Sequence, residues 1–328
     1  MRHHNRRNRQ PGSQKTAVVD TKAAMESTSD DSSTKAAEQG GHPPARENKN
    51  LDTPVLLTPQ YYAHNNGFQR KFSNWVLDFC QALFRRETDE TQQFLDLGCG
   101  TGDFTRECLL PRCLPCRRMV AVDLSADMID YARSHWVHDA LEFRKLDITV
   151  DEHVADLLGE YGAFDRVYSF HCLHWALNQP AALKNVARLL KPGGECLLVF
   201  HASLQAMDVC RNITKIERWS KYAPVVDRFV PATQDMDDCE RIEYASKLLK
   251  EAGLSPSILE LPRCTVFDGC SLDTLLGVYI TLNPVADILP DEEKMAAVKD
   301  TVELIRTMHS SDADKSRYRV YVIKASKM

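Results

Sequence analysis

The chain has 328 residues, 43% of them hydrophobic, and this is enough to form a full hydrophobic core. Its formal net charge of −5 provides no basic surface for a nucleic-acid backbone. No apolar run is long enough to span a membrane and the N-terminus lacks the apolar core of a secretory signal, so we expect a cytoplasmic protein without nucleic-acid or membrane partners. Its 11 scattered cysteines favour reduced thiols over a disulfide framework.

The first 50 residues differ in composition from the rest of the chain. They are rich in polar and charged residues and nearly free of aromatic and β-branched ones. Such a segment cannot bury enough apolar surface to offset the entropy lost on ordering. We therefore expect a disordered polar tail over residues 1–50 and one main domain over residues 51–328.

An amphipathic helix is predicted after this tail, because apolar residues recur there at helical spacing: Phe72, Trp75, Val76, Phe79 and Leu83. Beyond it, strand-like runs alternate with helical stretches. The strands are predicted at residues 92–98, 118–125, 141–148, 164–171 and 193–200. This alternation is typical of βαβ units, so the fold class is α/β with a parallel, Rossmann-like sheet.

The alternation of strand-like runs and helical stretches ends near residue 200. Residues 203–231 carry many apolar side chains without a strand pattern, and with the helix that follows they predict a helical insertion over about 203–250 that covers the substrate site. Further helices are expected at residues 271–281 and 291–309. Two last strand-like runs, at 257–267 and 318–325, are expected to complete the sheet at its edge.

A glycine-rich segment from Gly98 to Gly102 follows the first predicted strand and opens a helix. Glycines at such a turn let a ligand approach the backbone, so we expect Gly98, Gly100, Thr101 and Gly102 to line a cofactor site. A dinucleotide fingerprint would need glycine where Asp103 stands, and no phosphate-binding Gly-Lys-Ser/Thr follows. The segment therefore favours a ligand with a ribose and a positively charged end.

Acidic residues stand at the ends of the first three predicted strands: Asp96, Asp123 and Asp147. Asp96 is suited to an ammonium group, Asp123 to ribose hydroxyls and Asp147 to an adenine amino group. Leu124 and Ile148 are then expected to lie against the adenine ring. A lone aspartate at a strand end is more often a helix cap, but three beside a glycine loop indicate a binding site.

Four sequences spread over roughly residues 94–200 resemble the class I S-adenosylmethionine-dependent methyltransferases: DLGCGTG, VDLS, LDI and LLKPGGE. The resemblance implies a seven-stranded sheet with an antiparallel last strand. It also implies S-adenosylmethionine as the cofactor.

The turn after the fourth predicted strand reads SFHCLHW, from Ser169 to Trp175. It lies at the carboxyl end of the sheet, where ligands bind in open α/β folds, so the methyl acceptor is expected here. We assign Ser169 to the cofactor site, and His171, His174 and Trp175 to the substrate site. Each histidine taken alone is more often structural than functional.

Most of residues 60–325 resemble the juvenile hormone acid methyltransferases of arthropods, on the sequences SFHCLHW, MDVCRNI, VDRFVP and YAHNNGFQR. In that family a glutamine of the N-terminal helix and the tryptophan of CLHW orient the substrate carboxylate, and Gln69 and Trp175 match them. The implied acceptors are farnesoic acid and juvenile hormone acid. The chain departs from the family in its polar N-terminal extension and in His171, where an aromatic residue is common.

The chemistry of a carboxylate acceptor is compatible with these residues. A carboxylic acid is already ionised at neutral pH, so methyl transfer to it needs no catalytic base. Rate enhancement can come from holding the reactants in line in a dry pocket. Together with this chemistry, the resemblance implies an O-methyltransferase for the carboxylate of a lipophilic small acid, with Gln69 and Trp175 as its catalytic residues.

Alternatives stay open at this point. The chain could methylate another small molecule or a macromolecule, or be a non-catalytic terpenoid-binding protein with the same fold; Asp103 disfavours an NAD-dependent dehydrogenase. Cys113 and Cys116 have zinc-like spacing but no second pair follows, so no metal site is expected. The oligomeric state is not predicted.

Overall fold

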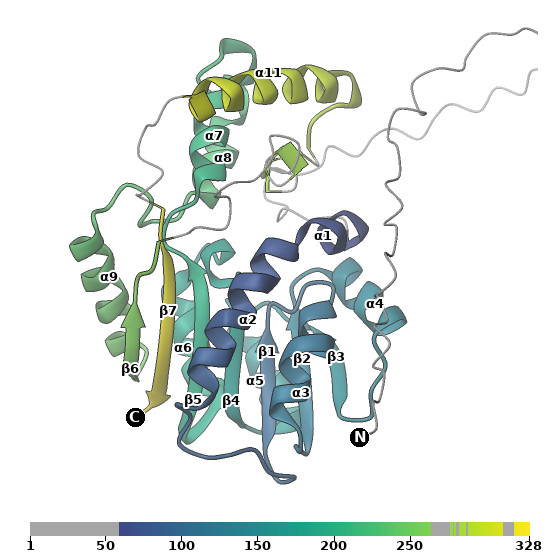
Figure 1. Cartoon of the computed structure of the whole chain (residues 1–328), viewed down its shortest axis with the longest axis vertical. Helices are drawn as coiled ribbons and strands as arrows, with labels where there is room; N and C mark the ends of the chain where they lie inside the picture. The colour runs from purple at the N-terminus through teal and green to yellow at the C-terminus, as the bar shows by residue number, and fades with distance from the viewer. Residues whose placement is uncertain (1–58, 264–275, 278, 280–281, 287, 311–317) are drawn as a thin grey trace, which may run out of the picture. The chain divides into compact units, whose positions relative to one another are not determined.

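The strands form one seven-stranded sheet in the described part of the chain, in the order β3-β2-β1-β4-β5-β7-β6 (Figure 1). They are β1 (Gln93–Leu97), β2 (Arg118–Asp123), β3 (Leu141–Lys145), β4 (Phe164–Phe170), β5 (Leu190–His201), β6 (Leu254–Glu260) and β7 (Val320–Lys327). The first five strands are parallel, and β7 runs antiparallel between β5 and β6. The predicted class I methyltransferase sheet is confirmed, including its antiparallel last strand.

The computed structural model describes residues 59–263, 276–277, 279, 282–286, 288–310 and 318–328. The tail predicted over residues 1–50 lies outside the described residues, as does most of the helix predicted at 271–281. None of the described helices has the length and apolar character needed to span a membrane.

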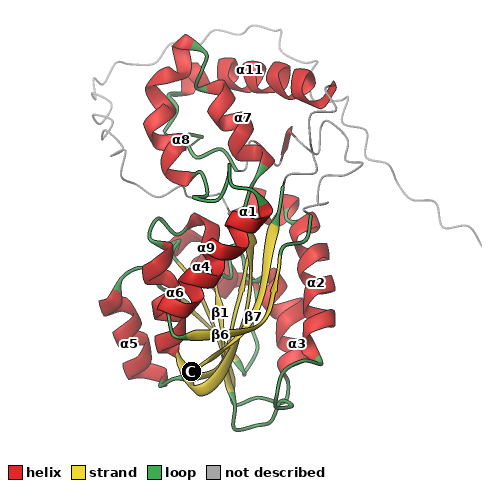
Figure 2. Cartoon of the chain, turned by 90° about the vertical axis from the view of Figure 1, so that its left-hand side faces the viewer, coloured by secondary structure: helices red, strands yellow, loops and turns green. Residues whose placement is uncertain are grey.

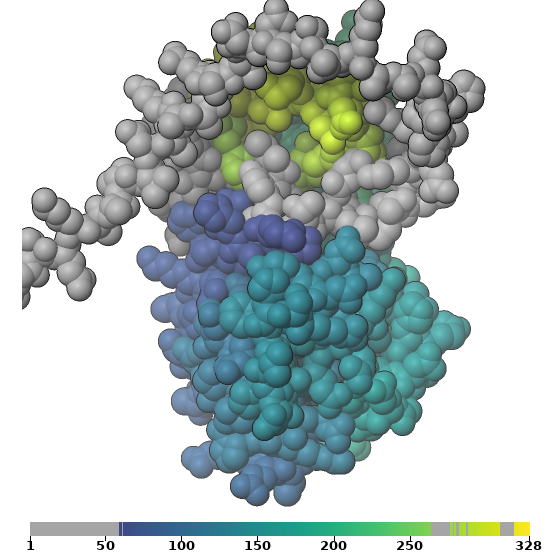
Figure 3. Space-filling view, turned by 90° about the vertical axis from the view of Figure 1, so that its right-hand side faces the viewer, coloured from purple at the N-terminus to yellow at the C-terminus, as the bar shows by residue number. Residues whose placement is uncertain are grey.

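Helices cover both faces of the sheet (Figure 1). One face carries α2 (Gly67–Gln81), α3 (Leu110–Cys113) and α4 (Ala126–His135), and the other carries α5 (Asp151–Tyr161), α6 (Gln179–Leu189) and α9 (Asp238–Glu251). With both faces covered, the central strands are nearly continuous apolar runs, as in Met119 to Val122. The short helix α1 (Pro59–Asn65) contacts α4, and Figure 3 shows the two meeting at the surface.

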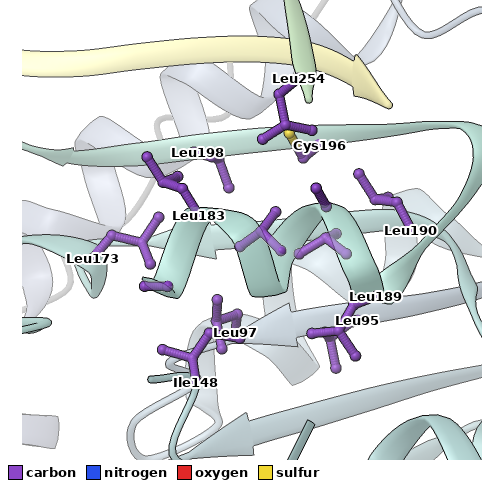
Figure 4. Packing of buried hydrophobic residues seen from close by; sticks show 14 of the residues in the cluster. Leu95, Leu97, Ile148, Leu173, Leu183, Leu189, Leu190, Cys196, Leu198 and Leu254 are labelled. Atoms are coloured by element: carbon purple, nitrogen blue, oxygen red, sulfur yellow. The ribbon is translucent and has the colours of Figure 1, made fainter. Parts of the chain in front are cut away.

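The larger core lies between the sheet and the helices α5, α6 and α9. Figure 4 shows Leu95 and Leu97 of β1 and Leu198 of β5 on either side of Leu183 from α6. All four side chains are at most 2% exposed. Burying a leucine side chain contributes roughly 1.5 to 3 kcal/mol to stability, so this packing fixes the positions of the strand ends that carry the site.

Helix α2 buries a different face from the one predicted. Val76 is buried as expected, but Trp75 is 61% and Phe79 is 63% exposed, and their rings stack at 6.3 Å. The residues buried against the sheet are Ser73, Val76, Leu77 and Cys80. Helix α2 has two rows of residues at helical spacing, one with the aromatic pair Trp75 and Phe79 and one with the smaller Ser73 and Cys80. The row with the smaller side chains faces the sheet.

The predicted insertion divides into two parts. Helices α7 (Gln205–Ile213), α8 (Ala223–Phe229) and α11 (Asp291–Ser310) pack together with the 3-10 helix η4 (Glu217–Tyr222) around an apolar cluster of their own (Figure 2). Helix α9 instead places Ala245, Leu248 and Leu249 in the core beneath the sheet. Residues 238–250 of the predicted insertion therefore pack against the sheet and not with α7 and α8.

Candidate active site

The glycine loop is shaped by left-handed backbone at Gly98, Gly100 and Gly102, whose φ angles are +80°, +54° and +75°. Its amides are already engaged. Those of Gly98 and Cys99 donate to the carbonyl of Val122, at 2.8 and 3.0 Å, and that of Gly100 donates to the Asp123 carboxylate at 2.9 Å. These three donors are not free for a phosphate group, so the loop differs from an anion-binding turn.

Close packing explains two of the glycines. A Cβ atom on Gly98 would lie 2.3 Å from the Cβ and Sγ atoms of Cys172, so the loop backbone rests directly on the turn after β4. A Cβ atom on Gly102 would lie 2.8 Å from the ring of Phe143. Neither position has room for a side chain. Thr101, predicted to line the cofactor site, is fully buried and donates its hydroxyl to Asp103 at 2.7 Å.

Asp96 is a buried acid at the end of β1. Its side chain is 3% exposed and accepts a hydrogen bond from the Thr105 hydroxyl at 2.6 Å. Thr105 begins the π-helical turn η2 (Thr105–Leu109) that follows the loop. Burial raises the pKa of Asp96 to about 7, the hydrogen bond from Thr105 opposes the rise, and the charge of Asp123 adds to it.

Asp123 ends β2 and is held by backbone amides. Besides the amide of Gly100, it accepts a hydrogen bond from the amide of Ser125 at 2.9 Å. Burial raises the pKa of this carboxyl, and the amide hydrogen bonds oppose the shift. Leu124 is 41% exposed beside it, so an apolar side chain is accessible next to the acid.

Asp147 follows β3 and makes local hydrogen bonds. One carboxylate oxygen accepts from both the amide and the hydroxyl of Thr149, at 2.9 and 2.7 Å. These bonds shape the turn after β3; the helix cap that the sequence offered as the alternative role is not formed by Asp147, since the N-cap of α5 is Val150. Ile148 is buried, and its carbonyl accepts a hydrogen bond from Asn185 of α6 at 2.8 Å. The adjacent order of β1, β2 and β3 brings Asp96, Asp123 and Asp147 to neighbouring strand ends.

Asp103 joins the loop to the N-terminal helices, a role that the sequence did not reveal. One of its oxygens accepts hydrogen bonds from Asn66 at 2.9 Å and from Arg70 at 2.8 Å. Arg70 also pairs with Glu107 at 2.5 Å. Helix α2 is thus fixed at the first turn after the glycine loop. Asn66 and Arg70 lie more than 30 residues from Asp103 in the sequence, and no spacing motif links them to it.

A cavity with a free volume of about 380 Å³, part of it open to solvent, lies between α2 and the loop. Cofactor-side and substrate-side residues line it together: Tyr62, Asn66, Gln69, Asp96, Gly98 and His171. Gln69, predicted to contact the substrate, therefore lies on the same cavity as the glycine loop. Burial strongly raises the pKa of Tyr62, so this phenol is neutral beside Gly100.

The turn after β4 carries the remaining predicted site residues. Ser169 is fully buried and donates its hydroxyl to the carbonyl of Leu97 at 2.9 Å, which ties the ends of β4 and β1 together. His171 has a φ of +53° and its amide donates to the carbonyl of Val199 at 2.7 Å. Left-handed backbone at a residue other than glycine is uncommon and concentrates at functional sites.

Three histidines meet at the ends of β4 and β5. His171 Nδ1 lies 3.3 Å from Nε2 of His201, and the ring of His174 packs edge-on against His201 at 4.9 Å. His174 also contacts Trp175, with ring centroids 5.0 Å apart. His201 was not predicted, although its place at the carboxyl end of the fifth strand was a usable signal.

Burial keeps this cluster neutral. It lowers the pKa of His171 to about 4, which the nearby backbone of Gln69 opposes, and it lowers the pKa values of His174 and His201 well below the usual range. No group of three His, Cys, Asp or Glu side chains in the described residues has an arrangement that could hold a metal ion. The cluster thus presents neutral imidazoles.

Comparison with known proteins agrees with this geometry. Residues 95–198 match the family model described as a methyltransferase domain. The chain is 33% identical over 224 residues to juvenile hormone acid O-methyltransferase of Bombyx mori, covering 66% of this chain and 75% of that protein. It is 29% identical over 259 residues to the protein of the same name from Drosophila melanogaster, covering 78% of this chain and 84% of that protein.

A solved structure supports the fold alone. The crystal structure of MccD protein superposes with a TM-score of 0.50 at 14% identity, covering 79% of this chain and 99% of that one. The sheet order, the glycine loop and the sequence similarity agree. The chain belongs to the class I methyltransferases, in the same family as the two juvenile hormone acid O-methyltransferases.

Proposed function

We propose that the chain uses S-adenosylmethionine to methylate the carboxylate of a lipophilic small acid. Two buried or partly buried carboxyl groups next to the glycine loop carry the cofactor part of the proposal. We assign Asp96 to the ammonium group and Asp123 to the ribose hydroxyls, because an ionised carboxylate accepts both kinds of hydrogen bond and both acids lie beside the loop. The engaged loop amides fit a ligand without phosphates.

The cofactor supplies a methyl group on a positively charged sulfur. The chain's own residues then have to position the acceptor and exclude water. Tyr62, 3.2 Å from where a Cβ atom of Gly100 would lie, and Asn66 come from the N-terminal helices and stand over the loop. Holding two reactants in line removes much of the entropic barrier of the transfer, without a nucleophile or base from the protein.

The acceptor part of the proposal follows from the relatives and from the surroundings of Trp175. Both relatives are named for methylating juvenile hormone acid. Trp175 is partly buried and packs on Phe229 of α8, with ring centroids 6.1 Å apart. It therefore joins the histidine cluster to the apolar helices, and we assign the carboxylate end of the acid to Gln69 and Trp175.

The apolar helices line a narrow, partly open depression, and we assign the hydrocarbon tail of the acceptor to it. Its free volume is about 450 Å³, part of it open to solvent. Apolar side chains form much of its wall: Val209, Ile213, Trp219, Val226, Leu289 and Ala297. Each buried methylene of a ligand contributes about 0.8 kcal/mol, so a sesquiterpenoid chain gains more there than a short polar acid. Farnesoic acid is the acceptor that we propose first.

An assay with radiolabelled cofactor tests this function. Farnesoic acid, a saturated fatty acid and an arginine-rich peptide are offered separately, and we expect label on farnesoic acid. Gln69→Glu should abolish transfer to the acid while cofactor binding persists, because a second carboxylate repels the substrate; Gln69→Ala is the uncharged control. Label on the peptide alone would contradict the carboxylate assignment, and label on the fatty acid alone would contradict the terpenoid.

A further inference from the structure

The histidine cluster contains unused hydrogen-bonding groups in a buried place. His174 and His201 are each 6% exposed. Three ring nitrogens make no hydrogen bond of ordinary geometry in the described part of the chain: His171 Nε2, His174 Nδ1 and His201 Nδ1. The backbone of Gln69 approaches the ring of His171 without completing such a bond. Leaving a buried polar group unpaired is destabilising, so such groups in a native protein call for an explanation.

The contact between His171 and His201 couples the proton positions of the two rings. A neutral imidazole has one N–H group and one bare nitrogen. If His201 donates from Nε2 to Nδ1 of His171, then His171 must carry its own proton on Nε2. In the reverse arrangement Nε2 of His171 is bare and repels an anion. His201 therefore decides whether His171 can act as a donor from Nε2.

Nε2 of His171 belongs to the side chain that lines the cavity shared by Gln69 and Gly98. The left-handed backbone of His171 and the ring of Phe72, 6.2 Å away, set the direction of this side chain. His174 packs edge-on against His201 and leads to Trp175. The cluster thus spans the distance between the two residues proposed to hold the acid.

We propose that His171 donates a hydrogen bond from Nε2 to the carboxylate of the acceptor, and that His201 is the positioning residue that fixes the tautomer required for this. The inference rests on the proposed function. In the transfer a bond forms between the carboxylate oxygen and the methyl carbon, the sulfur–methyl bond breaks, and its electron pair stays on sulfur. No proton moves.

Neutral imidazoles suit this role. A charged imidazolium could pass its proton to the carboxylate and remove the nucleophile, whereas a neutral N–H group orients the oxygen and leaves its charge in place. The lowered pKa of His171, about 4, keeps the ring neutral near pH 7. A hydrogen bond to a charged acceptor is stronger than one to the neutral ester product, so the cluster also favours acid over ester.

The test compares His201→Gln with His201→Met, two side chains of nearly equal shape of which only glutamine can donate to His171. Affinities for farnesoic acid and for methyl farnesoate are measured by calorimetry with S-adenosylhomocysteine present. We expect His201→Met to lower the ratio of acid to ester affinity about tenfold or more, and His201→Gln to retain most of it. Affinity for S-adenosylhomocysteine should stay unchanged in both, which shows that the fold is intact.

Nitrogen-15 NMR of the histidine rings gives a second measurement that does not depend on activity. In the wild type His171 should be protonated at Nε2 alone, and in His201→Met the two tautomers should mix. An unchanged affinity ratio in His201→Met, or a wild-type His171 protonated at Nδ1, would overturn the inference. If the wild type binds the cofactor product but no acid at all, the proposed function fails instead.

Discussion

The hydroxyl of Thr105 lies 2.6 Å from the carboxylate of Asp96, inside the turn that follows the glycine loop. Burial of this carboxylate, which the hydrogen bond from Thr105 only partly offsets, predicts that cofactor affinity depends on pH. The pKa of Asp96 is raised to about 7, so the carboxyl loses its charge as the pH falls below 7. A cationic cofactor should bind the charged form better, and affinity at pH 6 should be about tenfold lower than at pH 8.

Calorimetry with S-adenosylmethionine between pH 5.5 and 8.5 measures this dependence. Asp96→Asn should bind weakly and without the pH dependence. Thr105→Val keeps the shape of the side chain but removes the hydrogen bond that stabilises the carboxylate, so it should move the midpoint above pH 7. A wild-type affinity that is constant over this range would refute the role of Asp96.

A second prediction concerns how much the contact between Asp103 and Arg70 contributes to the stability of the fold. Asp103→Ala leaves Asn66 and Thr101 without their shared acceptor, and the unfolding free energy should fall by about 2 to 4 kcal/mol. Glu107→Gln is the control, because Glu107 pairs with the same Arg70 from an exposed position and should cost less than about 1 kcal/mol. Urea denaturation monitored by fluorescence compares them; equal losses would show that Asp103 is an ordinary surface partner.

A third prediction concerns the buried ion pair between Glu195 of β5 and Lys324 of β7, whose charged atoms lie 2.5 Å apart. Their side chains are 7% and 5% exposed. Glu195→Gln leaves a buried ammonium group unpaired and should destabilise the fold by about 3 to 5 kcal/mol. The double variant Glu195→Gln/Lys324→Met should recover part of this loss. Chemical denaturation decides, and a double variant less stable than the single one would contradict the argument.

The parallel strands were predictable because each is a short apolar run bounded by turn residues, and buried strands have this pattern whatever their neighbours. The buried face of α2 was not. Trp75 and Phe79 are at helical spacing, as are Ser73 and Cys80, and hydrophobicity favours the aromatic pair. Tertiary packing selected the smaller side chains, which a single sequence does not show.

Some residues of the candidate site could likewise be predicted from the sequence, and others could not. Gly98, Asp96 and Asp123 were predictable because a loop between a strand and a helix has a recognisable local pattern. The contact between His201 and His171 and the role of Asp103 were not, because the partners are distant in sequence: His171 is 30 residues from His201, and Asn66 is 37 residues from Asp103. Contacts of this kind arise from the strand order and from the position of α2.

The last prediction concerns the packing of Gly98 on Cys172. Gly98→Ala puts a Cβ atom 2.3 Å from both side-chain atoms of Cys172, in backbone with a φ of +80°, so it carries a steric and a conformational cost. Gly253→Ala is the control, because its φ is +75° and nothing lies within 4 Å of the new atom.

The control should lose about 1 kcal/mol from backbone strain alone. Gly98→Ala should lose more than this and bind S-adenosylmethionine at least about tenfold more weakly, because the loop must move away from the turn that carries His171. Replacing Cys172 by glycine in the same chain removes both clashing atoms, so Gly98→Ala/Cys172→Gly should regain cofactor affinity while the strain remains. Melting curves and calorimetry on the four proteins separate the two costs. If the double variant binds no better than Gly98→Ala, the contact with Cys172 does not set the position of the loop.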